Sequence, residues 1–274
     1  MIVESVIATI TAIVAAYLWE VQIRGRVRIR QIRSAEDRWV TGFLELYSNL
    51  FLEDGTNYSC EEMLEFTQAT PGDRHVEVEN IILAAIYRGE VVGFLLCHFY
   101  PERRKAIISY FGVNKEVLEA RNGAATVLLK KLKKVLSKRR RSCEFIFFDM
   151  QGVEEGLPPE EVAKRRARPV LFRQSARTLK MKSVTFDFPY RCPKVSLAPG
   201  TREYPFSLMC VPLSRDIPKP APRALVISFL EFLYLDCYGD VYPVSDPRFA
   251  EHHAYLESVI ADYRGSLPEF VPWH

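Results

Sequence analysis

The sequence predicts an α/β protein in which a mixed, largely antiparallel sheet is flanked by helices, with a hydrophobic helix at the N-terminus. Two observations predict the sheet. Apolar runs at 80–87, 91–100 and 105–113 follow one another across short turns, as the strands of an antiparallel meander do. A stretch with helical periodicity at 123–136 then leads to another apolar run at 143–148, and such a strand–helix–strand unit pairs its strands in parallel.

The N-terminal helix is predicted from residues 5–19, which carry no charge and are dominated by Ile, Val and Ala. A bilayer core needs about 20 residues, so this segment spans it only with help from its flanks. Five arginines follow between 24 and 33, and no Lys or Arg precedes the segment, which places the rest of the chain in the cytoplasm. We expect a single-pass membrane anchor at 1–24. A buried or interfacial amphipathic helix is the alternative, because Glu4 and Glu20 shorten the apolar run.

Short local signals predict the elements that lead into the meander. Residues 27–32 alternate apolar and polar side chains, which is typical of a half-buried strand. Residues 34–51 and 57–69 have helical patterns, and Ser59 is suited to cap the second helix. The first two strands of the meander form a hairpin, since Gly89 supplies the dihedral angles of a tight turn.

The second half of the chain continues the α/β pattern. A basic helix is predicted at 158–180, and two further strands at 183–190 and 205–212. After a proline-rich link, helices are predicted at 224–237 and 246–263. This order of strands and helices fits one mixed domain.

Length and composition are those of an ordinary globular protein. The 274 residues are 48% hydrophobic and 26% charged, and the net charge is only +3. We expect the anchor at 1–24, an α/β domain at 25–215 and a helical extension at 216–274 that packs on this domain. The apolar helix of the extension most simply covers the sheet, with a homodimer interface or a membrane-facing surface as alternatives. The six cysteines have no CxxC spacing, which predicts reduced, buried thiols.

The turn before the predicted helix at 123–136 is suited to bind phosphate. The first N–H groups of a helix have no intrahelical partner and lie at the positive end of its dipole. Gly123 and Ala125 let an anion approach the backbone closely, while Arg121 and Thr126 could add a positive charge and a hydroxyl donor. The alternative is that the small residues only let the helix pack closely on the strand.

These residues carry a resemblance to a known family. Within 107–129, the sequence ISYFGVNKE and then ARNGAATVLL resembles the fourth strand, pyrophosphate loop and third helix of the GNAT acyl-CoA N-acyltransferases. The family loop has the form Q/R-x-x-G-x-G/A, and Ala120 here stands at its first Q/R position. The resemblance covers about residues 27–213 and implies acetyl-CoA or another acyl-CoA as co-substrate. The cofactor-binding residues that it implies are Phe111, Gly112, Val113, Arg121, Asn122, Gly123, Ala124, Ala125 and Thr126.

Two catalytic groups expected from the resemblance are missing. The family commonly places a carboxylate early on the fourth strand, where this chain has Ile107, and a tyrosine in the helix after the fifth strand, where it has Phe172. The substitutes that we expect are Asp149 just past the fifth strand, Tyr110 and Ser109 on the fourth strand, and Tyr190 on the sixth. Catalysis by water and an already neutral amine, or loss of catalysis, are the alternatives.

The resemblance therefore gives two hypotheses of function. In the first, the protein is an N-acyltransferase, tethered to the cytoplasmic face of a membrane, that transfers an acyl group, most simply acetyl, to an amine. In the second, it is a catalytically inactive GNAT-fold binding or regulatory module at the membrane.

Basic residues form two clusters in the second half of the chain. Residues 130–141 hold eight basic residues, and 164–177 hold a second cluster. A solvated helix face is the default, and a coenzyme A phosphate, an acidic carrier protein or anionic lipid are the alternatives. Nucleic acid is not expected, because no aromatic residues are interleaved for stacking. No metal is expected either, since His253 and Glu257 supply only two ligands at helical spacing.

Overall fold

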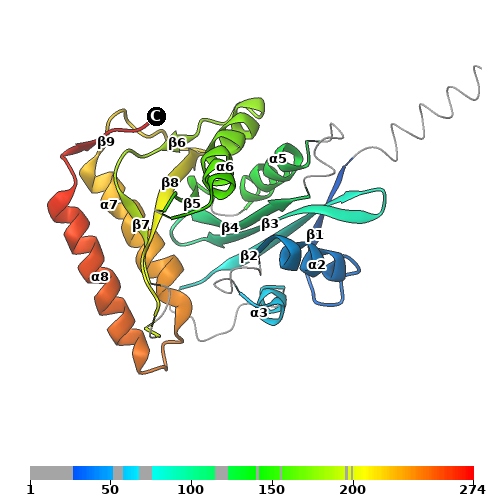
Figure 1. Cartoon of the computed structure of the whole chain (residues 1–274), viewed down its shortest axis with the longest axis horizontal. Coiled ribbons are helices and arrows are strands. Elements are labelled where there is room, and N and C mark those ends of the chain that lie inside the picture. The colour runs from blue at the N-terminus through cyan, green and yellow to red at the C-terminus, as the bar shows by residue number, and fades with distance from the viewer. Residues whose placement is uncertain are drawn as a thin grey trace, which may run out of the picture. The chain divides into compact units, whose positions relative to one another are not determined.

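The computed structural model describes residues 27–51, 58–67, 76–114, 123–139, 142–154, 156–194, 197–198 and 200–274. These residues form two compact units (Figure 1). The first unit comprises the described parts of 1–68, 82–95 and 111–131, and the second comprises those of 69–81, 96–110 and 132–274.

From β1 to β8, the strands and helices of the described residues follow the order that the sequence predicts, with β7 as an additional strand. The main sheet contains β1 (Arg28–Ile32), β2 (Glu79–Tyr87), β3 (Glu90–Tyr100), β4 (Lys105–Val113), β5 (Phe145–Gln151), β6 (Val184–Thr185), β7 (Tyr190–Cys192) and β8 (Tyr204–Pro212). Their pairing order is β1-β2-β3-β4-β5-β8-β6, with β7 also on β8, and β9 (Ala221–Pro222) and β10 (Phe270–Val271) form a separate pair. The β4–β5 pair is parallel, whereas β1–β2 and β5–β8 are antiparallel, so the mixed, largely antiparallel sheet is confirmed.

In the first unit, helices cover both faces of the strands. Phe94 of β3 packs on Phe43 and Phe51 of α2 (Val40–Phe51), with ring centroids 5.1 and 5.9 Å apart. The neighbouring Gly93 faces Leu128 of α5 (Ala124–Leu136). Since successive residues of a strand point to opposite faces, α2 and α5 lie on opposite sides of β3.

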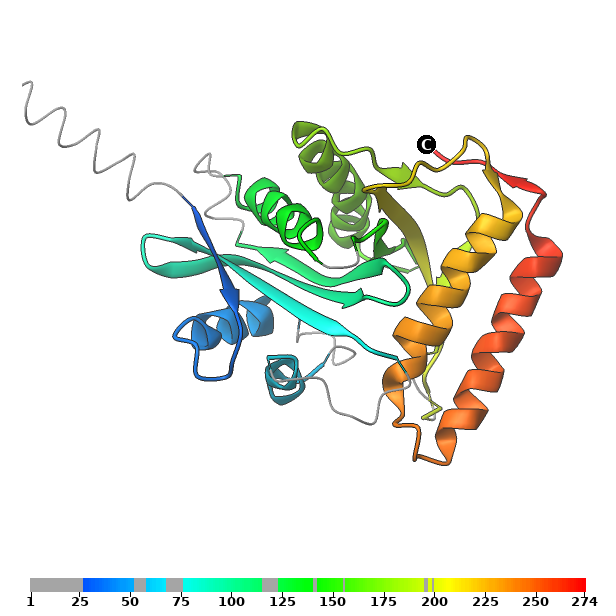
Figure 2. The same cartoon turned by 180° about the vertical axis from the view of Figure 1, so that it is seen from behind.

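In the second unit, β5 is likewise covered on both faces. Phe147 packs against Phe229 of α7 (Arg223–Glu231), at 5.0 Å between ring centroids. The next residue, Phe148, stacks on Phe172 of α6 (Pro159–Thr178) at 4.7 Å. Figures 1 and 2 show α8 (Arg248–Ser266) alongside α7, so the C-terminal helices form a layer over the core of this unit.

Local signals in the sequence locate several turns and caps correctly. Arg88 and Gly89 have φ of +52° and +90°, as a two-residue hairpin turn requires. Ser59 caps α3 (Cys60–Glu65): its hydroxyl accepts from the Glu62 N–H at 3.2 Å, and its own N–H donates to the Glu62 carboxylate at 2.6 Å.

Three boundaries differ from the prediction. Helix α2 begins at Val40 rather than 34, because residues 34–39 form turns in which the Asp37 carboxylate accepts the Trp39 N–H. The predicted strand 183–190 is divided into β6 and β7, and both pair with β8. After α7 the chain widens into the π-helix η2 (Phe232–Tyr238), followed by the short η3 (Gly239–Val241), before α8.

The predicted membrane anchor lies outside the described residues. Within the ranges that the structure describes, no helix is both long and apolar enough to cross a bilayer. This finding overturns the predicted single-pass, membrane-anchored localisation, which depended on such a helix. The physical weakness of that prediction is the short apolar run between Glu4 and Glu20, compared with the roughly 20 residues that a span needs. The predicted division of the chain into an α/β domain at 25–215 and a helical extension at 216–274 stays a prediction.

Candidate active site

Strands β4 and β5 pair only at their beginnings. Their parallel ladder consists of Lys105 with Phe145, Ala106 with Ile146 and Ile107 with Phe147. Beyond these pairs both strands continue, β4 to Val113 and β5 to Gln151, without further pairing between them. The β4–β5 ladder therefore ends just before Ile108 and Phe148.

Asp149 lies on β5, two residues after Phe147, which is the last β5 residue that pairs with β4. It is inside the strand, not after its end as predicted, because β5 extends to Gln151 along β8. Its carboxylate accepts hydrogen bonds from two tyrosines: Tyr190 of β7 at 3.3 Å, and Tyr238 at the end of η2. Tyr190 is buried, while Asp149 and Tyr238 stay partly exposed. We call Asp149, Tyr190 and Tyr238 the carboxylate–tyrosine cluster.

The electrostatics of the cluster favour a proton acceptor of unusual basicity. Burial raises the pKa of Asp149 above its ordinary value, and the hydrogen bonds from Tyr238 and Tyr190 lower it only in part. Burial and the nearby Asp149 charge hold the pKa of both tyrosines well above the usual range, so they keep their protons. The neighbouring Cys192 thiol is also desolvated, with a pKa raised to about 12.

A framework of buried tyrosines holds the strand that carries Tyr190. The Tyr234 hydroxyl donates to the Arg191 carbonyl at 2.5 Å. The Tyr263 hydroxyl donates to the Pro189 carbonyl at 3.1 Å and accepts from the Arg191 N–H at 3.0 Å. The C-terminal helices thus tie down the backbone on both sides of Tyr190, which limits its freedom relative to Asp149.

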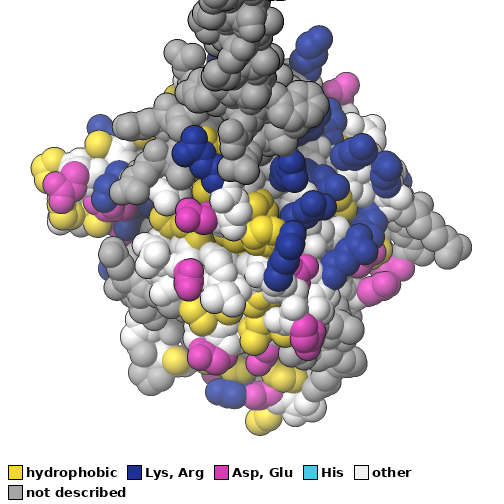
Figure 3. Space-filling view, turned by 90° about the vertical axis from the view of Figure 1, so that its right-hand side faces the viewer, with side chains coloured by type: hydrophobic (Ala, Val, Ile, Leu, Met, Phe, Trp, Pro, Cys, Tyr) yellow, Lys and Arg dark blue, Asp and Glu magenta, His cyan; other side chains and the backbone are white. Residues whose placement is uncertain are grey.

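The start of α5 has the features that the sequence predicts for an anion site. Gly123 has φ +53°, a left-handed conformation that favours glycine, and it is exposed. Its carbonyl accepts the first intrahelical bond from Val127 at 2.9 Å, so the N–H groups of Ala124, Ala125 and Thr126 precede the helical ladder. Arg121 and Asn122 lie outside the described residues. Basic side chains gather on one part of the face that Figure 3 shows, and α5 itself contributes Lys130 and Lys134 to the exposed surface.

The other predicted site residues have different surroundings. Ser109 is half-buried and Tyr110 is buried on β4. Phe111 and Val113 are half-buried at the end of the same strand. At Gly112, an added Cβ would lie 2.7 Å from Leu50 Cδ1, so packing against α2 alone accounts for glycine there.

The two positions that lack the expected catalytic groups are packing positions. Ile107 is 5% exposed within the core of the second unit. Phe172 is 4% exposed and stacks on Phe148. Neither position offers a proton donor or acceptor.

Sequence reasoning missed Tyr238. Tyr238 directly follows the apolar helix that is predicted at 224–237, and no local signal indicates a polar contact. Tyr238 is 89 residues from Asp149 in the chain, and it comes at the end of the π-helix, a form that is often found at functional sites.

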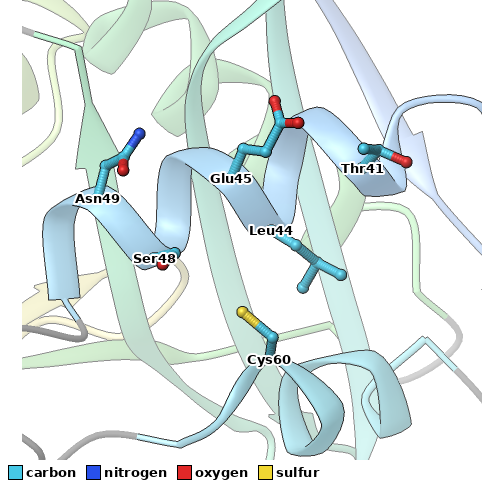
Figure 4. Close-up of a pocket in the computed structure, with 6 residues that line it drawn as sticks. All are labelled: Thr41, Leu44, Glu45, Ser48, Asn49 and Cys60. Carbon is cyan, nitrogen blue, oxygen red and sulfur yellow. The ribbon is translucent and has the colours of Figure 1, made fainter.

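A shallow pocket between α2 and α3 contains none of the predicted site residues. It measures about 470 Å³ and is lined by Thr41, Leu44, Glu45, Ser48, Asn49 and Cys60. Figure 4 shows Leu44 and Ser48 of α2 pointing toward Cys60 of α3. Within the described chain, no group of three or more His, Cys, Asp or Glu side chains could hold a metal ion.

Comparison with known families decides which fold this geometry belongs to. Residues 41–153 match the model of the acetyltransferase (GNAT) family. The matched range contains the end of the β4–β5 ladder, the start of α5 and Asp149. The described sheet and its helices are therefore a GNAT-like α/β fold, as predicted. A comparison with curated protein sequences gives no match.

Solved structures of acetyltransferases are also similar to this chain. Diaminobutyrate acetyltransferase from Paenibacillus lautus, in complex with its substrate L-2,4-diaminobutyric acid and coenzyme A, is 19% identical over 70% of this chain and 99% of its own, with a TM-score of 0.43. Aminoglycoside 6'-N-acetyltransferase from Enterococcus faecium is 17% identical over 70% and 99%, with a TM-score of 0.43. Ribosomal-protein-S18-alanine N-acetyltransferase from Escherichia coli is 13% identical over 69% and 96%, with a TM-score of 0.41.

Proposed function

We propose that this protein is an acyl-CoA-dependent N-acyltransferase in which Asp149 is the general base. The observation that carries the proposal is the carboxylate–tyrosine cluster beside the end of the β4–β5 ladder. A GNAT-like fold implies an amine acceptor in general, and acyl transfer to an amine needs a group that removes a proton from nitrogen. Among the four substitutes that the sequence suggested, Asp149 is the carboxylate.

The proposed reaction moves one proton and one acyl group. The amine nitrogen attacks the thioester carbonyl, the C–N bond forms, and the Asp149 carboxylate accepts the proton that the nitrogen loses. The C–S bond then breaks and the thiolate takes up a proton. A base with a raised pKa holds that proton more firmly than an ordinary carboxylate, which favours the transfer.

Tyr190 and Tyr238 would orient the base and not serve as first proton donors. Both hydroxyls already donate to Asp149, and both pKa values are raised well above normal. After Asp149 is protonated, the carboxyl no longer needs both donors, and a tyrosine hydroxyl becomes available to the thiolate. Ser109 and Tyr110 on β4 stay predicted substitutes.

The start of α5 is the proposed pyrophosphate site. The left-handed Gly123, the three N–H groups that precede the helical ladder and the absence of any acidic residue in the first turn suit a bound anion. A side chain at Gly123 would meet only the Thr126 Cβ at 3.9 Å, so there is open space over the glycine.

The test separates binding from turnover. Isothermal calorimetry with acetyl-CoA and longer acyl-CoAs should show binding to both the wild-type protein and Asp149→Asn. Thiol release across a panel of amines should fall by about 10²–10⁴-fold in Asp149→Asn, the usual contribution of a general base. The matched control is Asp216→Asn, because the Asp216 side chain is 93% exposed and lies 3.9 Å from the Lys182 ammonium group. A rate unchanged in Asp149→Asn would remove the base assignment.

The alternative function is a GNAT-fold module that binds without catalysis. Ile107 and Phe172, which occupy the family's usual base and acid positions as buried hydrophobic residues, favour it. Binding of acyl-CoA by the wild-type protein, without thiol release for any amine in the panel, would select this alternative.

A further inference from the structure

One face of α6 exposes an apolar strip. Ala163, Ala167, Val170 and Leu171 are all exposed, with Val170 at 43% and Leu171 at 59%. Their spacing of four, three and one residues places them on the same side of the helix, where the exposed Gln174 also lies. The opposite side is buried through Arg165, Phe172 and Ala176. The strip therefore faces solvent, although it is made of residues that gain free energy when buried.

Basic residues border the strip on both sides. At 100° per residue, Arg166 and Arg177 fall along one border, and Lys164 and Arg168 fall along the other. Lys164 and Arg168 reach the Glu161 carboxylate at 3.3 and 3.8 Å, yet their side chains are still 52% and 50% exposed. In the described part of the chain, Arg166 and Arg177 have no ion-pair partner.

This arrangement does not serve the stability of the helix. Like charges four residues apart, such as Arg173 and Arg177, destabilise a helix by about 0.2–0.5 kcal/mol. Pro169 removes a backbone donor in the middle of α6. A helix face optimised only for solubility would alternate the signs of its charges, whereas here the acidic residues of α6 lie only in its first turn.

We propose that this face of α6 is a docking surface for an acidic protein partner. The partner presents a helix whose apolar strip lies between two rows of carboxylates. Its apolar side chains cover Ala167, Val170 and Leu171, and its carboxylates pair with the bordering Arg and Lys side chains. An apolar centre with a charged rim is the common anatomy of such interfaces, and charge complementarity sets their specificity. This inference goes beyond the proposed acyl transfer and does not depend on it.

The test uses a synthetic helical peptide and the full chain. The peptide carries leucines along one face and glutamates on both flanks, and a matched peptide carries lysines in place of the glutamates. We expect fluorescence anisotropy to show binding of the glutamate peptide only, and to show weaker binding at higher salt concentration. Chemical-shift changes of the wild-type protein should map to α6.

Two variants and one control locate the interaction. The double variant Arg166→Glu/Arg177→Glu should weaken peptide binding by at least about tenfold. The double variant Val170→Ser/Leu171→Ser should weaken it by a similar factor. The control is Lys130→Glu with Lys134→Glu, which changes the net charge by the same amount on exposed positions of α5. This control should keep affinity within about twofold. Circular dichroism checks that each variant is folded.

Four results would overturn the proposal. They are no binding of the glutamate peptide, equal binding of the lysine peptide, equal loss in the α5 control, and chemical-shift changes away from α6. Phosphatidylglycerol vesicles and duplex DNA are the competing polyanions. If the vesicles or the DNA bind more tightly than the peptide, and the double variant Arg166→Glu/Arg177→Glu loses this binding, the surface would be assigned to that polyanion instead.

Discussion

Replacing Tyr238 with Phe removes one of the two hydroxyls that hold Asp149, and leaves only Tyr190 at 3.3 Å. A hydrogen bond to a charged group contributes about 1.5–3 kcal/mol to stability, and one between neutral groups about 0.5–1.5 kcal/mol. Tyr238→Phe should therefore lower the free energy of unfolding more when Asp149 is ionised than when it is protonated, with a difference of about 1 kcal/mol or more.

The sign of the pH dependence follows from the pKa of Asp149. Burial raises the pKa of Asp149 in the folded state above its value in the unfolded state. The protonated carboxyl therefore stabilises the folded protein fully at pH values below the unfolded-state pKa. This stabilisation is lost as the pH rises through the folded-state pKa. The Tyr238 hydrogen bond lowers the pKa, and its removal makes this loss larger. The gap in stability between wild type and Tyr238→Phe should thus widen as the pH rises.

Urea unfolding at a series of pH values from about 4 to 8 measures this gap. The matched control is Tyr234→Phe, whose hydroxyl donates to the neutral Arg191 carbonyl at 2.5 Å and not to a carboxylate. Its loss of stability should be the same across the series. A gap for Tyr238→Phe that stays constant with pH, or that equals the gap of the control throughout, would refute the assigned contact between Tyr238 and an ionisable Asp149.

Three further predictions follow from other positions. Gly123→Ala should lower the free energy of unfolding by about 1 kcal/mol because Gly123 has a positive φ, and it should weaken coenzyme A binding in calorimetry. The control Gly265→Ala in α8 should raise the free energy of unfolding by about 0.5–1 kcal/mol. Equal changes in stability for the two variants would contradict the left-handed turn at Gly123. Ile107→Glu puts a charge into the core and should lower the free energy of unfolding by several kcal/mol without raising the rate of thiol release, and a stable, faster variant would disprove the packing role. Arg103→Ala leaves the buried Asp236 carboxylate without its 2.7 Å partner and should lower stability by about 1–3 kcal/mol in thermal unfolding at neutral pH, so an unchanged midpoint would contradict the pair.

Local chemistry in the sequence determined much of the fold. The hairpin at Arg88 and Gly89, the Ser59 cap and the bounds of β4 depend on residues within a few positions of one another, so their signals can be read directly. The same is true of Gly123, because a left-handed residue before a helix has a local steric cause. The N-terminal anchor was also predicted from a local pattern, but its short apolar run was too weak a signal.

The candidate catalytic residues needed the tertiary structure. Asp149 and Tyr190 were both named from the sequence, but their hydrogen bond joins residues 41 positions apart, and Tyr238 joins them from 89 positions away. The pKa of Asp149 depends on burial, which comes from the packing of η2, β7 and β5, and no single segment contains that information. The sequence by itself determined which side chains could carry the chemistry; only the tertiary structure decided which of them meet, because hydrogen bonds and desolvation depend on distance in space.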